Sequence, residues 1–387
     1  MGKHIPPFDN KNKAIIDIND EVTPLCYFNQ VILEKGQIHT YTLEEYESVI
    51  VLAGGTCCIT VTDETGKSET FDNIGKRASV WEGNPEAVYV PVGYTAQVEC
   101  VSDKADVMIA GGKFEAALEP FAVRQEEVDI VQYGSDDTKT HRKIKHVLGQ
   151  SNAEQRGRLL VSELFTVGAG GWSGFPPHKH DEDRVKEDGS RETLYQEVYQ
   201  FRFNPDFGFG AQFLYEHEDD FGPVYHVRTG SVIAIDKGYH PSVAAPGYEM
   251  YYFTIIVGKT DKSLVQHFDP HHEYQVHTIP ASRHDCQIQI TGREVMLVNL
   301  NDLLPDAAAS DYAVPCFNVF GYEDARAVVE AAEATGKPVI LACNKDVADF
   351  YGVETAAAMF LGLAQKATVL CVCTLTTLTM KTLSSAP

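Results

Sequence analysis

The sequence predicts an all-β protein of two barrels, followed by an α/β segment. Three observations indicate this. Short β-rich runs broken by Gly, Pro, Asn and Asp extend from Val31 to about Gln275, and the two halves of this region share a Gly-Tyr turn. After about Arg293, strand and helix patterns alternate instead. Many short strands with regular turns are typical of barrels and sandwiches, whereas alternation is typical of a parallel α/β fold.

The strand patterns are apolar runs rich in β-branched and aromatic residues, each bounded by turn residues. In the first half they cover residues 48–52, 56–61, 87–91 and 96–101. In the second half they cover residues 159–165, 197–203, 231–235 and 250–257. We therefore expect one barrel in residues 1–125 and a second in residues 126–292.

A shared turn relates the two halves. Each contains a Gly-Tyr pair shortly after an apolar run, and aligning these pairs places Gly93 with Gly238 and Thr95 with His240. Together with the similar strand patterns, this indicates an internal duplication.

Length and charge limit the functions to be considered. The 387 residues indicate two or three domains at ~100–200 residues per domain. The formal charge of −23 would repel phosphate backbones and anionic lipids, so neither nucleic acid nor a membrane is expected as a partner. The chain has no run of ~18 apolar residues and no C-x-x-C pair among its nine cysteines. We therefore expect a cytoplasmic protein.

The stretch 175–181, Phe-Pro-Pro-His-Lys-His-Asp, holds the strongest chemical signal. On a strand, His178 and His180 would share one face. Glu197 follows on a predicted strand, and His240 lies at the glycine turn. A lone His-x-His is more often a surface pair, but these separations match the two motifs of a cupin barrel. The set suits Zn, Mn, Fe or Ni, and we expect an open, catalytic metal site.

The short sequence motifs around these positions resemble those of the 5-deoxy-glucuronate isomerase family of myo-inositol catabolism. The resemblance extends from about Leu25 to Tyr274 and is weaker in the first half. It is carried by residues 171–181, 197–205, 208–210 and 238–248. The resemblance implies a bicupin, that is, two double-stranded β-helix barrels, and a homo-oligomer.

The resemblance also implies the metal site. The implied ligands of a divalent ion (Zn, Mn or Fe) are His178, His180, Glu197 and His240. The family often has two successive Glu residues before its Tyr, but here the first is Gln196, so only Glu197 can serve. In the first barrel Thr95 replaces the turn histidine, which implies that this barrel is metal-free.

The implied reaction is the aldose–ketose isomerisation of 5-deoxy-D-glucuronate to 2-deoxy-5-keto-D-gluconate. It needs a group that moves a proton between two carbons, for which the candidates are Tyr199, Tyr239 and Tyr252. For each of them, the more common role of such a tyrosine is in an amphipathic core position. The substrate carboxylate needs a cation, and the candidates are Arg202 and Lys237, although Arg202 alternates away from Glu197. A non-catalytic cupin that binds a sugar acid and an iron cupin dioxygenase are the alternative functions.

The last part of the chain resembles a different family. Residues 296–304, 312–319, 331–333 and 338–341 are similar to the N-terminus of class II fructose-bisphosphate-type aldolases, such as the 6-phospho-5-dehydro-2-deoxy-gluconate aldolase. We expect residues 293–372 to form part of a TIM barrel, too short to close eight strands. That family continues with a metal-binding His-Leu-Asp-His, whereas residues 373–387 read as an off-frame tail. We hypothesise a frameshift there and expect no aldolase activity.

Overall fold

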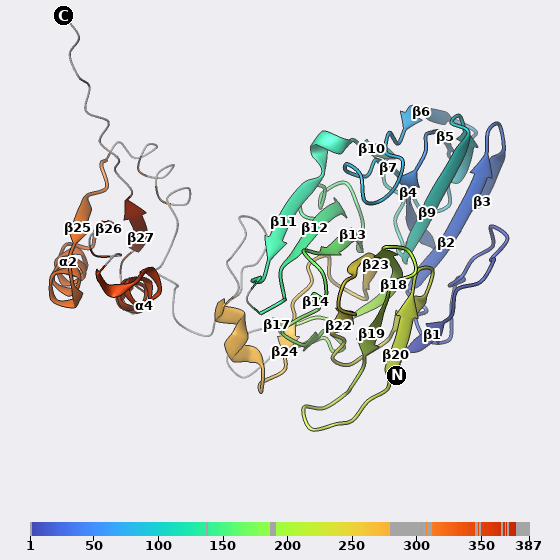
Figure 1. The fold of residues 1–387 in the computed structure, drawn as a ribbon. Helices are drawn as coiled ribbons and strands as arrows, with labels where there is room; N and C mark the ends of the chain where they lie inside the picture. The colour runs from blue at the N-terminus through green and yellow to red at the C-terminus, as the bar shows by residue number, and fades with distance from the viewer. Residues whose placement is uncertain are drawn as a thin grey trace, which may run out of the picture. The chain divides into compact units, whose positions relative to one another are not determined.

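The computed structural model describes residues 2–136, 138–185, 191–278, 312–344, 350–364 and 371–376, and positions 303, 307, 347, 367 and 369. The chain divides into two compact units, Met1–Gln287 and Ile288–Pro387. Two barrels were predicted for the first unit, and its sheets form two barrels (Figure 1). Within the described ranges, no helix is both long and apolar enough to cross a bilayer.

The first barrel consists of two antiparallel sheets. Its strands are β2 (Cys26–Glu34), β3 (Ile38–Thr42), β4 (Tyr46–Gly54), β5 (Cys57–Thr62), β6 (Ser68–Ile74), β7 (Ala87–Val90), β8 (Thr95–Cys100), β9 (Lys104–Lys113) and β10 (Phe121–Val123). The larger sheet has the order β10-β7-β4-β9-β2 and the smaller β3-β8-β5-β6. A short 3₁₀ helix, η1 (Gln125–Glu127), follows. The barrel interior is a continuous apolar core that includes Ile50, Val98 and Ile109.

The second barrel uses more of the chain and includes its first strand. Its strands are β1 (Lys3–Ile5), β11 (Asp129–Tyr133), β12 (Arg142–Leu148), β13 (Leu159–Thr166), β14 (Trp172–Ser173), β15 (His178–Lys179), β16 (Arg184–Val185), β17 (Arg191–Glu192), β18 (Tyr195–Asn204), β19 (Phe209–Phe213), β20 (Val224–Arg228), β21 (Val232–Ile235), β22 (Ser242–Ala244), β23 (Glu249–Gly258) and β24 (His267–Phe268). The 3₁₀ helix η2 (Glu273–Thr278) follows. The main sheet has the order β1-β21-β18-β23-β13-β12-β11, and a second has the order β14-β22-β19-β20. Two further pairs are β15-β24 and β16-β17.

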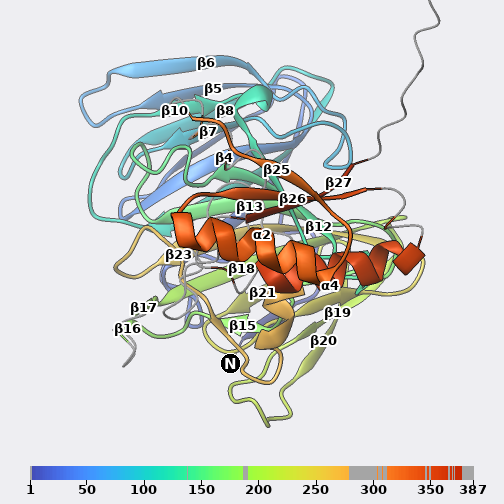
Figure 2. The same cartoon turned by 90° about the vertical axis from the view of Figure 1, so that its left-hand side faces the viewer.

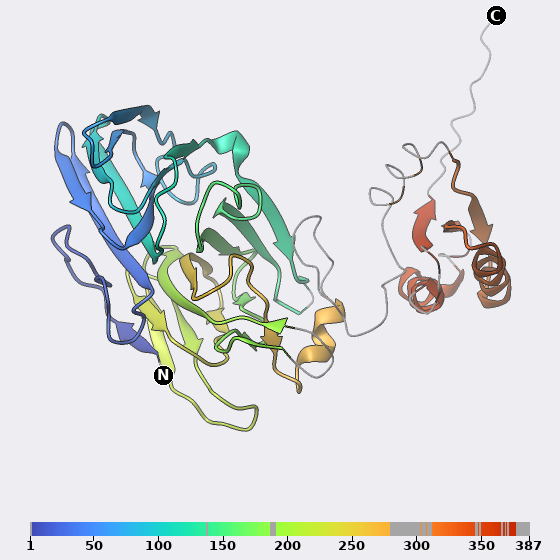
Figure 3. The same cartoon turned by 180° about the vertical axis from the view of Figure 1, so that it is seen from behind.

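The two barrels pack against each other through their large sheets (Figure 3). Phe28 of β2 and Phe253 of β23 meet there, with ring centroids 6.1 Å apart. A buried ion pair crosses the interface: Arg77 donates to both carboxylate oxygens of Glu163, at 2.8 and 2.5 Å. One face of the large sheet of the second barrel therefore belongs to the interface, and the opposite face lines the barrel interior.

The Gly-Tyr turns have the same backbone conformation in both barrels. Gly93 has a φ of +78° and Gly238 a φ of +89°, a region that disfavours residues with a Cβ. A Cβ on Gly238 would also lie 2.6 Å from the carbonyl oxygen of Tyr215. This equivalence is what an internal duplication predicts, and in the second barrel it places His240 at the end of a tight turn.

The second unit contains a small parallel sheet. Its elements are β25 (Cys316–Val319), α2 (Tyr322–Thr335), β26 (Val339–Asn344), α4 (Val353–Ala364) and β27 (Cys371–Thr376), and the strand order is β25-β26-β27 (Figure 2). Helix α2 begins where Asp324 accepts from the backbone of Phe320 and Gly321, and it ends at Gly336 with a φ of +63°. The predicted α/β alternation is confirmed. Of the tail predicted at 373–387, residues 373–376 belong to β27 and the remainder lies outside the described residues.

Candidate metal centre

Three histidines and one glutamate meet inside the second barrel. His178 is on β15, with His180 directly after it, Glu197 is on β18, and His240 follows the turn after β21. The ligating atoms of the three histidines all lie within 4.8 Å of one another. Glu197 Oε1 is 2.7 Å from His180 Nε2, and Glu197 Oε2 is 3.7 Å from His240 Nε2. The structure thus brings all four predicted ligands together, and all are buried.

Backbone carbonyls fix the orientation of each imidazole. The Nδ1 atoms of His178, His180 and His240 face the carbonyl oxygens of Pro176 (3.1 Å), Tyr195 (3.3 Å) and Gly238 (2.8 Å), respectively. A carbonyl oxygen can only accept, so each Nδ1 carries the proton and donates it. The lone pair of each ring is then on Nε2, where a metal can use it.

Within the described part of the chain, three atoms of the cluster have no hydrogen-bond partner. His180 Nε2, His240 Nε2 and Glu197 Oε2 are buried and lack a hydrogen-bond partner, and the close approach of His180 Nε2 to Glu197 Oε1 lacks hydrogen-bond geometry. Leaving buried polar atoms unpaired costs about 1–3 kcal/mol each. A divalent cation would satisfy all of them, because imidazole nitrogen and carboxylate oxygen are common ligands of Zn, Mn and Fe. The residues therefore fit a divalent metal.

The electrostatics of the cluster favour the metal-binding protonation states of Glu197 and His178. At His180, burial would lower the pKa, but the Glu197 carboxylate outweighs it and raises that pKa. Burial alone would raise the pKa of Glu197, but His180 and His240 outweigh it and lower that pKa to about 2. Burial, with the neighbouring His240 and His180, lowers the pKa of His178 well below its ordinary value. Near neutral pH, Glu197 is therefore charged and His178 is neutral, as metal coordination requires.

Two of the three predicted catalytic tyrosines lie beside the cluster. The Tyr199 hydroxyl faces Glu197, and the ring centroid of Tyr199 is 6.2 Å from that of His240 and 4.8 Å from that of Tyr252. The Tyr252 hydroxyl contacts Ser173. Burial raises the pKa of Tyr199 well above its ordinary value and that of Tyr252 to about 12. Both phenols are therefore protonated near neutral pH and act as hydrogen-bond donors rather than bases.

The third tyrosine is directed elsewhere. The Tyr239 hydroxyl donates to Glu218 Oε1 at 2.7 Å, and its ring packs between Tyr215 and the ammonium of Lys179. Tyr239 therefore occupies the glycine turn without pointing at the metal ligands.

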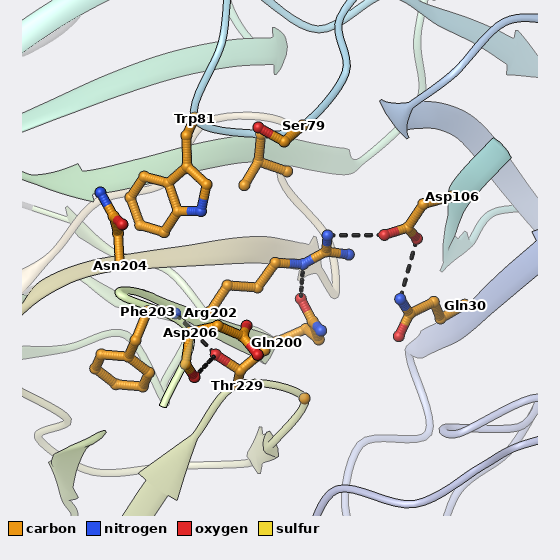
Figure 4. Close-up of a pocket in the computed structure, with 12 residues that line it drawn as sticks. Gln30, Ser79, Trp81, Asp106, Gln200, Arg202, Phe203, Asn204, Asp206 and Thr229 are labelled. Carbon is orange, nitrogen blue, oxygen red and sulfur yellow. Dashed lines mark hydrogen bonds and ion pairs between the residues drawn. The ribbon is translucent and has the colours of Figure 1, made fainter. Parts of the chain in front are cut away.

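The structure does not bring the two predicted carboxylate-binding cations to the cluster. Arg202 lies on the opposite face of β18 from Glu197, and its Nη1 is 2.8 Å from Asp106 of the first barrel. It lines a separate cavity of about 500 Å³ between the barrels, next to Trp81 (Figure 4). Lys237 pairs with Glu216 at 3.0 Å and is 44% exposed. Strand alternation explains the position of Arg202, since neighbouring residues point to opposite faces.

Sequence reasoning missed another cation. Arg142 of β12 donates from Nη1 to the carbonyl oxygen of Phe175 at 2.8 Å, close to the His-x-His segment. Its sequence context, Arg-Lys-Ile-Lys, has the pattern of an exposed strand. The fold, and no sequence motif, places it beside the site.

Comparison with known proteins agrees with this architecture. Residues 3–275 match the KduI/IolB family, and residues 298–375 match the class-II fructose-bisphosphate aldolase family. The 5-deoxy-glucuronate isomerase of Geobacillus kaustophilus is 33% identical over 251 residues, which are 64% of this chain and 84% of that protein. The isomerase of the same name from Bacillus subtilis strain 168 is 31% identical over 68% of this chain and 93% of the relative.

A solved structure supports the same conclusion. The crystal structure of an IolB-like protein from Salmonella typhimurium LT2 superimposes with a TM-score of 0.58 and 26% identity, covering 65% of this chain and 89% of that one. The family match covers more than half of the chain, and the chain covers most of its relatives' length. With its two cupin barrels, the chain belongs to the KduI/IolB family and is an isomerase.

Proposed function

We propose that this isomerase is a metal-dependent aldose–ketose isomerase that converts 5-deoxy-D-glucuronate to 2-deoxy-5-keto-D-gluconate in myo-inositol catabolism. One observation carries the metal dependence: three buried histidines present their Nε2 atoms to a common point beside Glu197, while carbonyl oxygens hold their Nδ1 atoms. The substrate follows from the names of the relatives at 31–33% identity. Zn, Mn and Fe all suit this ligand set.

His178, His180, Glu197 and His240 would hold the ion. When bound, such an ion polarises a carbonyl as a Lewis acid. The protein residues then have to move two kinds of proton: one from C2 to C1, and one between the two sugar oxygens.

The carbon-bound proton needs a base, and a carboxylate suits this role better than a phenol. Asp181 lies next to His180, and its Oδ2 accepts from the backbone of Gly238 at 2.9 Å. Its Oδ1 is buried and has no hydrogen-bond partner among the residues that the structure describes. We assign the transfer from C2 to C1 to Asp181.

The oxygen-bound proton needs a donor that stays protonated. Tyr199 meets this condition, because its pKa is raised and its hydroxyl lies against Glu197. We assign the exchange of the hydroxyl proton between the two sugar oxygens to Tyr199, with Tyr252 holding its ring in place at a centroid distance of 4.8 Å.

The test follows 5-deoxy-D-glucuronate by NMR with metal-loaded protein, in D₂O and in H₂O. We expect wild type to form the ketose and His178→Ala to lose turnover. The matched control is His226→Ala on β20, whose ring packs against Phe209, and it should retain turnover. No product from wild type would refute the proposed reaction, and oxygen consumption without ketose would point to the dioxygenase.

A further inference from the structure

The proposed substrate carries a carboxylate at one end of its carbon chain and an aldehyde at the other end. A protein that selects such a sugar acid needs a cation that is not already neutralised. Arg202 has Asp106 at 2.8 Å, and Lys237 has Glu216 at 3.0 Å, so both charges are already paired. Arg142 differs from both.

Arg142 is a guanidinium that has no counter-ion in the part of the chain that the structure describes. Its Nη1 donates to the Phe175 carbonyl, and its centre lies 5.7 Å over the ring of Tyr133. Among the residues that the structure describes, no carboxylate lies within the 4.0 Å of an ion pair. Burial lowers its pKa, and the charge interactions that oppose this come from tyrosines rather than acids. An arginine has five N–H donors, so most of those on Arg142 remain available.

The sheet register places Arg142 on the inner face of the barrel. Ile144, two residues further along β12, pairs with Leu164, and Leu164 pairs with Tyr252. Tyr252 in turn pairs with Phe201 of β18, which lies in the barrel core. Because side chains alternate along strands, Arg142 shares the face of these residues.

This position is next to the metal-binding segment. Phe175, which accepts from Arg142, precedes His178 by three residues. Tyr199 and Tyr252, the two tyrosines beside the cluster, are among the groups that interact electrostatically with Arg142. The guanidinium therefore lies on the inner face of the barrel, beside these tyrosines and the segment that carries His178.

Another cation of the region, Lys179, does not compete for this role. It lies between His178 and His180 on the strand and therefore points away from their shared face. Its ammonium donates to the carbonyl of Glu216 and lies 5.0 Å over the ring of Tyr239.

We propose that Arg142 binds the carboxylate of the sugar acid and so selects acids over neutral sugars, an inference that rests on the function proposed above. Arg142 is half-buried, and a partly desolvated cation without a counter-ion among the described residues is unfavourable, which a carboxylate would relieve. The planar guanidinium also matches a carboxylate by two parallel hydrogen bonds, which fixes the far end of the substrate while the aldehyde end lies at the cluster.

The experiment compares 5-deoxy-D-glucuronate with its C6 amide, which has the same shape and no charge. Wild type, Arg142→Gln and Arg142→Lys are assayed for kcat/KM on both compounds. The control is Lys143→Gln, which removes a cation from the same strand on the opposite face, over the ring of Phe165. Metal affinity is measured for every variant, so that a disturbed metal site is detected.

We expect Arg142→Gln to lower kcat/KM for the acid about 10- to 150-fold, the value of a charged hydrogen bond, while the amide changes less than about threefold. Arg142→Lys should recover part of the loss, and Lys143→Gln should behave as wild type. An equal loss on acid and amide, or an unchanged preference for the acid, would overturn the proposal.

A binding measurement separates this inference from the proposed reaction. Saturation-transfer NMR of metal-loaded protein compares D-glucuronate with D-glucuronamide. Wild type could bind the acid in preference to the amide, with Arg142→Gln losing that preference, and yet isomerise neither 5-deoxy-D-glucuronate nor its amide. This result would support the carboxylate site and refute the proposed reaction. If the preference persists in the variant, the carboxylate site is wrong.

Discussion

Replacing Glu197 by Gln tests the metal centre most directly. The substitution keeps the size of the side chain and removes one charge and one ligand atom. Glu197 is 2% exposed, and its oxygens lie 2.7 Å from His180 Nε2 and 3.7 Å from His240 Nε2. Surrounding solvent therefore cannot replace the lost charge.

Two magnitudes can be expected for this change, one from the pKa of Glu197 and one from the general cost of losing a metal ligand. In the metal-free protein, the fall of the Glu197 pKa from 4.5 to about 2 corresponds to roughly 3 kcal/mol of favourable interaction. This contribution is present above the unfolded pKa and is lost as the pH falls towards 2. In the metal-loaded protein, losing a residue that only orients a ligand costs about 10–100-fold in affinity, so losing a ligand should cost at least about 100-fold.

The assay measures metal affinity by competition with a chromophoric chelator at pH 7.5, together with urea unfolding of loaded and metal-free protein. At a metal concentration about 1,000 times the wild-type Kd, binding should stabilise wild type by about 4 kcal/mol. With 100-fold weaker affinity, Glu197→Gln should gain only about 1.4 kcal/mol at the same concentration.

Glu218→Gln serves as the matched control, because Glu218 accepts from Tyr239 and lies outside the cluster. Its metal affinity should remain within about threefold of wild type. If Glu197→Gln binds metal as tightly as this control, Glu197 is no ligand, and its pairing with His180 serves only to orient that ring.

Three further predictions concern neighbouring groups. Tyr199→Phe should lower kcat at least about 100-fold with unchanged metal affinity, because only the hydroxyl beside Glu197 is lost. An unchanged kcat in steady-state kinetics would contradict the assigned role. The pKa of His178 is lowered, so the contribution of its neutral ring to stability is complete above about pH 6.5 and is lost as the pH falls. In thermal melts between pH 8 and pH 5, the metal-free wild type should therefore lose more stability than His178→Ala. Arg77→Ala should destabilise the protein by about 3–5 kcal/mol in urea unfolding, because it leaves the buried Glu163 carboxylate without its ion-pair partner. Replacing both residues by Met should restore most of the lost stability.

Sequence reasoning located the cluster of three histidines and Glu197 because its signals are local. The spacing of His178 and His180 puts both rings on one strand face, and the glycine turn fixes the place of His240. The barrels and the α/β segment were also predictable, since hydrophobic periodicity and turn residues determine them. By contrast, the three-residue strand β1, which joins the second barrel through the pair Lys3–Ala234, is too short to produce a periodic signal.

Charge compensation was not predictable, because it depends on which strands become neighbours. Arg202 was a reasonable carboxylate site from sequence, yet it is paired with Asp106, 96 positions away. Arg142 reads as an exposed strand cation, yet the sheet turns it inward beside Tyr252. The sequence identifies which residues carry charge, and only the fold shows which charge lacks a partner.

The same criterion distinguishes the buried carboxylate of Glu47 from that of Glu197. Glu47 in the first barrel is fully buried, and its oxygens accept from the backbone of Gly157 and Leu159 and from the Tyr89 hydroxyl, at 2.7 to 2.8 Å. Both oxygens of Glu47 therefore have hydrogen-bond partners, and the carboxylate connects the two barrels, which is a structural role. Glu197 is equally buried, but its Oε2 has no hydrogen-bond partner. A buried carboxylate with an unpaired oxygen is retained against a cost in stability, which is expected where that oxygen binds a cation.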